Sequence, residues 1–305
     1  MNVIGAAADL NPGPGGVSLA IGVFDGIHLG HQSVIGRARE DARDHGAKSV
    51  VITFDRHPNS VVAPQSVPPL IYPLSQKLRL IESLGLDTAC VIHFDKAFSQ
   101  ISGETFVRDL ARHGGPVRSI CVGETFLFGC RRSGNVELLQ KLAVELGFQV
   151  RAVPDLSLNG QPISSTRIRE AIRSGNFDSA SQMLGRAYSL CGKVIAGEKV
   201  GRKLGFPTAN LDSEGIVTPP TGVYVAEAQT GGGAYRAAVN IGHRPTVHSA
   251  PRLCVEAHLL DFSGDLYGQE IKLTFLKKLR EERKFPSIEA LRQQISQDVA
   301  AARAA

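Results

Sequence analysis

Residues 22–31 read Gly22-Val23-Phe24-Asp25-Gly26-Ile27-His28-Leu29-Gly30-His31, and this stretch decides the fold of the first half of the chain. An apolar run over residues 17–23 leads into it and predicts a buried strand. A segment of helical character follows, from Gln32 to about Asp44. Free backbone N–H groups and the positive end of the helix dipole meet at such a turn, so it is a place where anions bind. The stretch therefore indicates phosphate binding and nucleotide chemistry.

The rest of the first half alternates between strand and helix patterns. We expect strands at 49–54, 88–94, 119–122 and 148–153, and helices at 74–84, 103–112, 136–146 and 177–184. Strands that alternate with helices of this length are typical of crossover units and of a mainly parallel sheet.

The pattern changes near Gly185-Arg186. From Tyr188 to about Phe275 the segments are short, β-rich and punctuated by glycine, which predicts a small antiparallel barrel or sandwich. A helix with one apolar stripe begins near Ser287. We therefore expect two domains, 1–186 and 187–305.

Composition narrows the function classes. The 305 residues carry a formal net charge of +5, but the basic residues are spread out, so we expect neither a nucleic-acid partner nor a membrane. The five cysteines are scattered, which favours a reducing compartment. The N-terminal stretch lacks the basic start and apolar core of a signal peptide, and we expect a cytoplasmic protein.

Two motifs of the first half contain residues that could take part in a reaction. His28 and His31 could bind ATP phosphates during adenylyl transfer, which needs positioning and positive hydrogen-bond donors; a helix-capping pair is the structural alternative. Residues 163–169, ISSTRIR, place hydroxyls before a helix expected at 167–173. The hydroxyls can simply cap the helix, but arginine in a first helical turn opposes the dipole, which favours a phosphate there.

Two further motifs lie in the second half. If residues 208–211 are extended, Thr208 and Asn210 share one face and could hold a hydrated Mg²⁺ with nucleotide phosphates; an ordinary Gly-Pro turn is the alternative. Strand alternation places Cys254, Glu256 and His258 on one face of residues 253–260. Glu256 is then either a solvent-facing carboxylate or a base in a cavity.

The ordered set of motifs resembles the bacterial bifunctional FAD synthetase family, in which a riboflavin kinase is joined to an FMN adenylyltransferase. The first half and the junction contain GVFDGIHLGHQ, TFDRHP, VGETFLFGCRRSG, ISSTRIREAI and LGRAYSLCG. The second half contains GRKLGFPTANL, GVYVAEA, VNIGHRPT, VEAHLLDFSGDLYG and LREERKFPSIEALRQQI. The resemblance implies a Rossmann-like nucleotidyltransferase α/β domain with a parallel sheet, then a small antiparallel β-barrel with a terminal helix.

The resemblance also implies an activity. Riboflavin and ATP would give FMN in the C-terminal domain, and FMN with a second ATP would give FAD and pyrophosphate in the N-terminal domain. Mg²⁺ is the expected cofactor and ATP the co-substrate, whereas FMN and FAD are substrate and product, not a permanent prosthetic group. We expect a monomer or a weak homo-oligomer.

Residue roles follow from the same resemblance. His28 and His31 would be catalytic in adenylylation, and Glu256 would take the proton from the 5′-hydroxyl of riboflavin. Thr208 and Asn210 would bind Mg²⁺–ATP. Thr125 stands where relatives have Asp or Asn, on the flavin-phosphate side of the first site. The other expected binding residues are Gly22, Phe24, Asp25, Gly26, Ser164, Ser165, Thr166, Arg169, Gly201, Gly205, Pro207 and Arg280.

Overall fold

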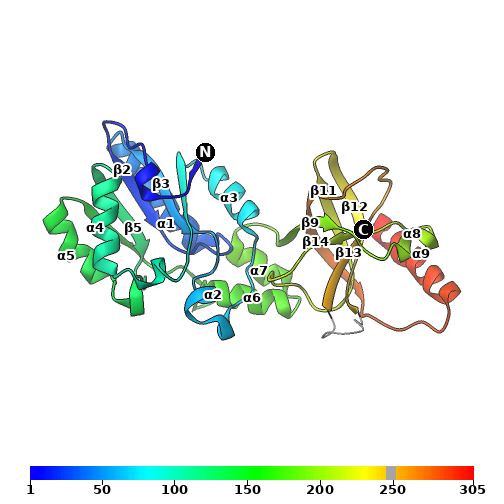
Figure 1. Cartoon of the computed structure of the whole chain (residues 1–305). Coiled ribbons are helices and arrows are strands. Elements are labelled where there is room, and N and C mark those ends of the chain that lie inside the picture. The colour runs from blue at the N-terminus through cyan, green and yellow to red at the C-terminus, as the bar shows by residue number, and fades with distance from the viewer. Residues whose placement is uncertain (245–251) are drawn as a thin grey trace. The chain divides into compact units, whose positions relative to one another are not determined.

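The protein folds into two compact units, seen in a computed structural model that describes residues 1–244 and 252–305 (Figure 1). The first unit comprises Met1–Leu70 and Leu74–Ser165, and the second comprises Ile71–Pro73 and Thr166–Ala305. Compactness alone does not test where the functional domains divide, so the boundary near residue 186 stays a prediction. Pro245 and Thr246, the end of the VNIGHRPT motif, lie outside the described residues.

A parallel sheet forms the centre of the first unit, in the strand order β1-β4-β3-β2-β5-β6. The strands are β1 (Asn2–Ile4), β2 (Val17–Ile21), β3 (Lys48–Phe54), β4 (Thr88–Ile92), β5 (Val117–Gly123) and β6 (Gln149–Val153). All of β2 is buried. The strand order reverses at β2 and β5, and ligands of open α/β sheets bind at the carboxyl edge of such a switch point. The 22–31 turn follows β2 at this edge.

Helices cover both faces of this sheet. Alternate residues of β2 divide between two cores: Leu19 packs in the cluster of α4 and α5, and Ala20 packs in the cluster of α1 and α3. The helices are α1 (Leu29–Asp44), α2 (Asn59–Val62), α3 (Leu74–Ser83), α4 (Gly103–His113) and α5 (Val136–Leu146). A small hairpin, β7 (Ser157–Leu158) with β8 (Gln161–Pro162), follows β6.

The second unit contains a closed antiparallel barrel in the order β10-β13-β12-β11-β14-β9. Its strands are β9 (Ser189–Ile195), β10 (Ala209–Leu211), β11 (Gly222–Thr230), β12 (Gly233–Arg244), β13 (Arg252–Leu259) and β14 (Glu270–Arg280). The accompanying helices are α6 (Ser165–Arg173), α7 (Phe177–Leu184), α8 (Val200–Leu204) and α9 (Ile288–Ala304). Phe177 of α7 stacks on Tyr188 and Phe275, and Ala302 of α9 is buried against Val225 and Leu260.

The predicted fold class is confirmed, with local differences. Helix α1 begins at Leu29 instead of Gln32, because His28 caps it, and α6 begins at Ser165, two residues before its predicted start. Strand β1 was not predicted, since three exposed or half-buried residues leave no apolar run. Ser287 caps α9 as expected, through its hydroxyl and the Ala290 N–H. Among the described residues, no helix is both long and apolar enough to cross a membrane.

Candidate functional sites

The turn after β2 adopts an unusual backbone. Three residues in a row of four have positive φ: Phe24 (51°), Gly26 (84°) and Ile27 (41°). Such angles are costly for Phe and Ile, and they persist only where the surroundings enforce them, which is common at functional sites. Gly22 is required sterically, since a Cβ there would lie 2.9 Å from the Phe24 ring. The turn is therefore tightly packed, and residues 24–28 are all buried.

The two histidines lie against each other at the start of α1. Their rings stack with centroids 3.5 Å apart, and His28 Nδ1 accepts a hydrogen bond of 3.3 Å from the His31 backbone N–H. His28 thus caps the helix, and in a neutral ring its proton must sit on Nε2, which can donate to an oxyanion. His28 is only 6% exposed, and Phe24 packs edge-on against His31. The structure thus shows the capping role of His28, and its part in catalysis stays a prediction.

Lys77 of α3 is a residue that the sequence motifs did not indicate. It is 8% exposed, and its ammonium donates to three groups at the carboxyl edge of β2 and β3. The acceptors are Phe54 O at 2.8 Å, Thr53 Oγ1 at 3.0 Å and Val23 O at 3.3 Å. Burial lowers the pKa of Lys77 to about 8, although Asp25 and Asp55 act to raise it. The only feature of the sequence that could have indicated Lys77 is the position of a lysine on the buried side of a predicted helix.

The boundary between the two compact units falls within the ISSTRIR motif. Ser165 is the first residue of α6, and its hydroxyl donates to the Asp25 carbonyl over 2.9 Å, so the sequence-based picture of hydroxyls standing before the helix is corrected. Ser164 precedes α6, whereas Thr166 and Arg169 lie on it and group with the second unit. Ser165 is thereby joined to the turn after β2, whose buried residues include Asp25 and Gly26.

An aromatic cavity of about 820 Å³ opens beside this turn. Three basic side chains, those of Lys96, Arg131 and Arg132, contribute to its lining. The phenylalanines in its wall are Phe54, Phe94, Phe98, Phe106, Phe126 and Phe128. Phe126 and Phe128 stack at 5.2 Å, and Thr125 beside them is exposed. The wall was missed because its rings come from segments far apart in the sequence, among them the end of β3 and helix α4, although FLFG in the sequence places two of them together.

The second site lies on the outer surface of the barrel. Strand pairing puts Glu256 of β13 directly between Asn210 of β10 and Asn240 of β12. Val255 and Ala257 point into the barrel core and are at most 1% exposed, so Glu256 points outward. The predicted face of Cys254, Glu256 and His258 is confirmed, since these alternate with the buried residues. Asn240 lies in the VNIGHRPT motif, but its role was not predicted, because only the strand register shows that it lies beside Glu256.

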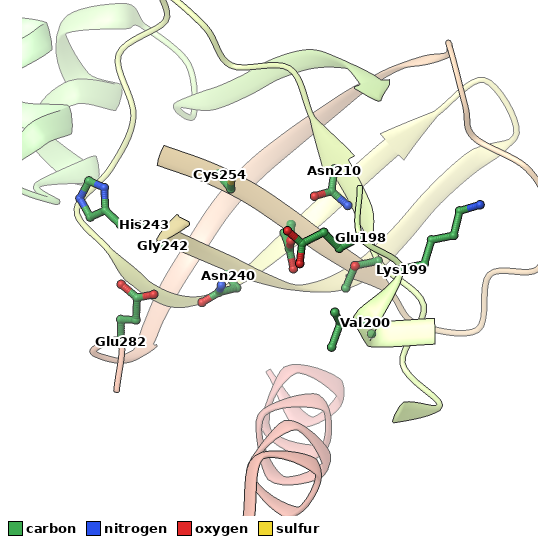
Figure 2. Close-up of a pocket in the computed structure, with 12 residues that line it drawn as sticks. Glu198, Lys199, Val200, Asn210, Asn240, Gly242, His243, Cys254 and Glu282 are labelled. Carbon is green, nitrogen blue, oxygen red and sulfur yellow. The ribbon is translucent and has the colours of Figure 1, made fainter. Parts of the chain in front are cut away.

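Two cavities meet at Glu256. A polar one of about 210 Å³ is lined by Thr208, Asn210 and Asn240. An adjoining, mostly apolar one of about 730 Å³ is lined by α8, the barrel and α9, with charged side chains such as Arg280 and Asp298 among them. Glu256 and Thr208 belong to both. Figure 2 shows Asn210 and Glu198 directed toward the same space of the polar cavity, while the Lys199 side chain extends away from it. The carboxylate therefore stands at a boundary between a polar and an apolar chamber.

The residues around PTAN hold these side chains in place. Gly197 has no room for a Cβ, which would lie 2.3 Å from the Asn210 amide nitrogen. Gly201 lies in the short helix α8, and Gly205 ends that helix with φ of 92°. The Pro207 carbonyl bonds to the His258 ring Nδ1 over 2.8 Å. The glycine-rich stretch is thus a compact helix and turn that fixes Thr208 beside Glu256.

Arg280 is held by α9. Its guanidinium makes a two-pronged contact with Asp298, at 3.0 Å from Nε and 2.7 Å from Nη2, and Asp298 is 7% exposed. Arg280 also lies over the Phe285 ring at 5.6 Å. Both residues line the 730 Å³ cavity beside Glu256. A direct role of Arg280 in ligand binding stays a prediction.

Comparison with known proteins gives a consistent assignment. The FAD synthetase family model matches residues 11–167, and the riboflavin kinase model matches residues 184–305. A bifunctional riboflavin kinase/FMN adenylyltransferase from Pseudomonas fluorescens is 38% identical, over 100% of this chain and 97% of that protein. The protein of the same name from Escherichia coli K12 is 36% identical, over 94% and 92% respectively.

A solved structure is similar over nearly the same extent. A protein from Streptococcus pneumoniae, named as a macrolide-efflux protein, has a TM-score of 0.82 and 28% identity, over 99% of this chain and 98% of that chain. Its name differs from those of the relatives, but two family models and full-length enzyme relatives agree on the assignment. The chain therefore belongs to the family of bifunctional riboflavin kinase/FMN adenylyltransferases.

Proposed function

We propose that the barrel phosphorylates riboflavin to FMN and that the parallel-sheet unit adenylylates FMN to FAD. Family membership supports the pair of activities, with ATP as co-substrate of both. The observation that carries the residue assignment is the position of Glu256 on the wall between a polar and an apolar cavity. A kinase needs its base where the acceptor hydroxyl meets the transferred phosphoryl group.

In the kinase step the flavin would occupy the larger cavity and the ATP phosphates the polar one. Glu256 accepts the proton of the ribityl 5′-hydroxyl, whose oxygen attacks the γ-phosphorus while ADP leaves. The Thr208 hydroxyl and the Asn210 amide oxygen lie in the same polar cavity, and such hard oxygen donors fit Mg²⁺. When bound, the ion would offset the charge of the phosphates. Asn240 would bind a phosphate or the ribityl chain.

In the adenylyl-transfer step an FMN phosphate oxygen attacks the α-phosphorus of ATP, and pyrophosphate leaves. His28 Nε2 and His31 donate to the phosphate oxygens as charge builds on them, next to the N-terminus of α1. The hydroxyls and Arg169 of the ISSTRIR motif would bind phosphates as well. The isoalloxazine ring would stack within the phenylalanine cavity, with Arg131 and Arg132 near the FMN phosphate.

We infer a cytoplasmic location for the enzyme. Each cysteine of the chain is a free thiol, which supports a reducing, cytoplasmic location. We infer a monomer or a weak homo-oligomer, and sedimentation velocity at micromolar concentration tests this. A stable dimer would contradict it.

Glu256→Gln tests the kinase assignment. The variant keeps the shape of the side chain but cannot take a proton, so riboflavin phosphorylation should fall about 10³-fold. Conversion of supplied FMN to FAD should stay at the wild-type rate. The matched control is Glu227→Gln, at an exposed position of β11. If Glu256→Gln still phosphorylates riboflavin at the rate of that control, Glu256 is not the base.

A further inference from the structure

We infer that Lys77 is a positioning residue for adenylyl transfer, acting through the turn that carries His28 and His31. The inference rests on the proposed function of that turn. Lys77 belongs to α3, more than forty residues along the chain from the turn, and none of the motifs above includes it.

The donor and acceptor numbers match at Lys77. An ammonium has three N–H donors and no acceptor, and three oxygen acceptors surround it: Phe54 O, Thr53 Oγ1 and Val23 O. The Thr53 hydroxyl in turn donates to Val23 O over 3.0 Å. Lys77 and Thr53 therefore clamp the carbonyl of Val23 together.

The clamped carbonyl lies where the sheet ends and the turn begins. The backbone pairing of β2 with β3 closes with the bond from Gly22 N–H to Ile52 O, at 3.1 Å. Beyond that bond β3 continues to Phe54, whereas the segment that follows β2 leaves the sheet. The residue after Val23 is Phe24, with its φ of 51°. Here the hydrogen bonds of Lys77 and Thr53 replace the backbone bonds between β2 and β3. They therefore fix the direction in which the turn leaves the sheet.

The charges around Lys77 agree with this role. Asp25, in the turn, is 5% exposed, and Asp55 follows β3; both act on Lys77 as counter-charges. Asp55 is itself bound by His93 at 2.7 Å and by Arg56 at 3.2 Å. A buried ammonium is costly, and an apolar side chain of the same length would fill the space at lower cost. A clamp on the turn explains why a charged donor stands there.

Loss of the proton removes one donor from the clamp. A neutral amine offers two N–H groups to three acceptors, so one of the three bonds is lost and the hold on the start of the turn weakens when Lys77 deprotonates. Because its pKa is lowered to about 8, this happens within the working range of an assay. Adenylyl transfer should then lose activity on the basic side with a midpoint near pH 8, while Lys77 has no influence on the kinase.

The test compares Lys77→Met, Lys77→Arg and the control Lys141→Met, which changes an exposed lysine of α5. Supplied FMN, ATP and Mg²⁺ give the rate of FAD formation. Urea unfolding of the same chains reports on the folding of the first unit, and riboflavin phosphorylation reports on the barrel. Lys77→Met should lose about 10²-fold in kcat for FAD formation, with a small change in KM, because misplacing a reacting group costs about that much. Lys141→Met should match the wild type.

The pH profile separates positioning from mere stability. Wild-type FAD formation should fall above about pH 8, and Lys77→Arg, which keeps its charge, should retain partial activity without that fall. A flat wild-type profile from about pH 7 to 9, or full activity in Lys77→Met, would overturn the inference. If Lys77→Met fails to fold, the comparison of the wild-type and Lys77→Arg profiles decides, and a fall above about pH 8 that persists in Lys77→Arg would overturn the inference. If the wild type makes no FAD from FMN, the proposed function itself fails, which is a different result.

Discussion

The two candidate sites are built in opposite ways. The adenylyl-transfer site is built around ten consecutive residues, 22–31, whose strained turn is fixed at its base by contacts from elsewhere. The kinase site draws single side chains from three neighbouring barrel strands and from α9, so that Glu256 meets Asn210 and Asn240 only through strand register. The first site thus depends on backbone geometry and the second on register, and each should fail when its own support is removed.

The largest expected effect separates chemistry from capping at His28. His28→Asn keeps a good helix cap but loses the imidazole, so FAD formation should fall about 10²- to 10³-fold with little change in stability. His28→Ala should lose the same activity and about 1 kcal/mol of stability in addition. FMN adenylylation and urea unfolding measure the two quantities. Wild-type activity in His28→Asn would mean that His28 only caps α1.

The anchor of α9 tests the dispersed character of the kinase site. Asp298→Ala leaves the Arg280 guanidinium without its buried partner, and we expect a loss of about 3 kcal/mol in the unfolding free energy of the second unit. KM for riboflavin should rise as well, since α9 lines the larger cavity. Asp261→Ala breaks the exposed pair with Arg303, and this control should change the unfolding free energy far less. Equal losses of unfolding free energy in the two variants would show that the Arg280–Asp298 pair does not anchor α9.

Acid should weaken the carboxyl edge of the first unit. Burial raises the pKa of Asp55, but the Phe94 N–H, Arg56 and His93 outweigh it and bring the pKa to about 2. Asp55 therefore stabilises the fold above its ordinary pKa, and about 2 kcal/mol is lost as the pH falls from about 4 to 2. Urea unfolding of Asp55→Asn should show a correspondingly shallower acid dependence. An unchanged slope would show that Asp55 is not the group responsible.

The smallest expected effect concerns the aromatic cavity. Phe98→Leu removes a ring from its wall but keeps much of the apolar volume, so KM for FMN should rise about 3- to 10-fold. KM for riboflavin in the kinase step should not change. Val144→Ala, at a position 89% exposed on α5, is the control. If KM for riboflavin rises instead, the flavin-binding roles of the two cavities need to be exchanged.

Features formed by residues close together in the sequence could be predicted, whereas those assembled by tertiary packing could not. The 22–31 turn and the PTAN stretch were recognisable because their chemistry is local. Alternation put Glu256 on one face with Cys254 and His258, and the structure was needed to show that this face is the outer one. Lys77, Asn240 and the phenylalanine wall were not, because tertiary packing brings them to their sites. The start of α1 was predicted too late, since a histidine is an uncommon cap and its role depends on the rotamer that brings Nδ1 to the His31 N–H.

The most direct test of two independent sites is a mixing experiment. Glu256→Gln and the double variant His28→Asn/His31→Asn are each incubated with riboflavin, ATP and Mg²⁺, and then together, with chromatography for FMN and FAD. Alone, the first should leave riboflavin unchanged and the second should stop at FMN, whereas the mixture should make FAD because released FMN reaches the intact adenylyl-transfer site. Loss of the same step in both variants, or no FAD from the mixture, would contradict the division of labour between the two sites.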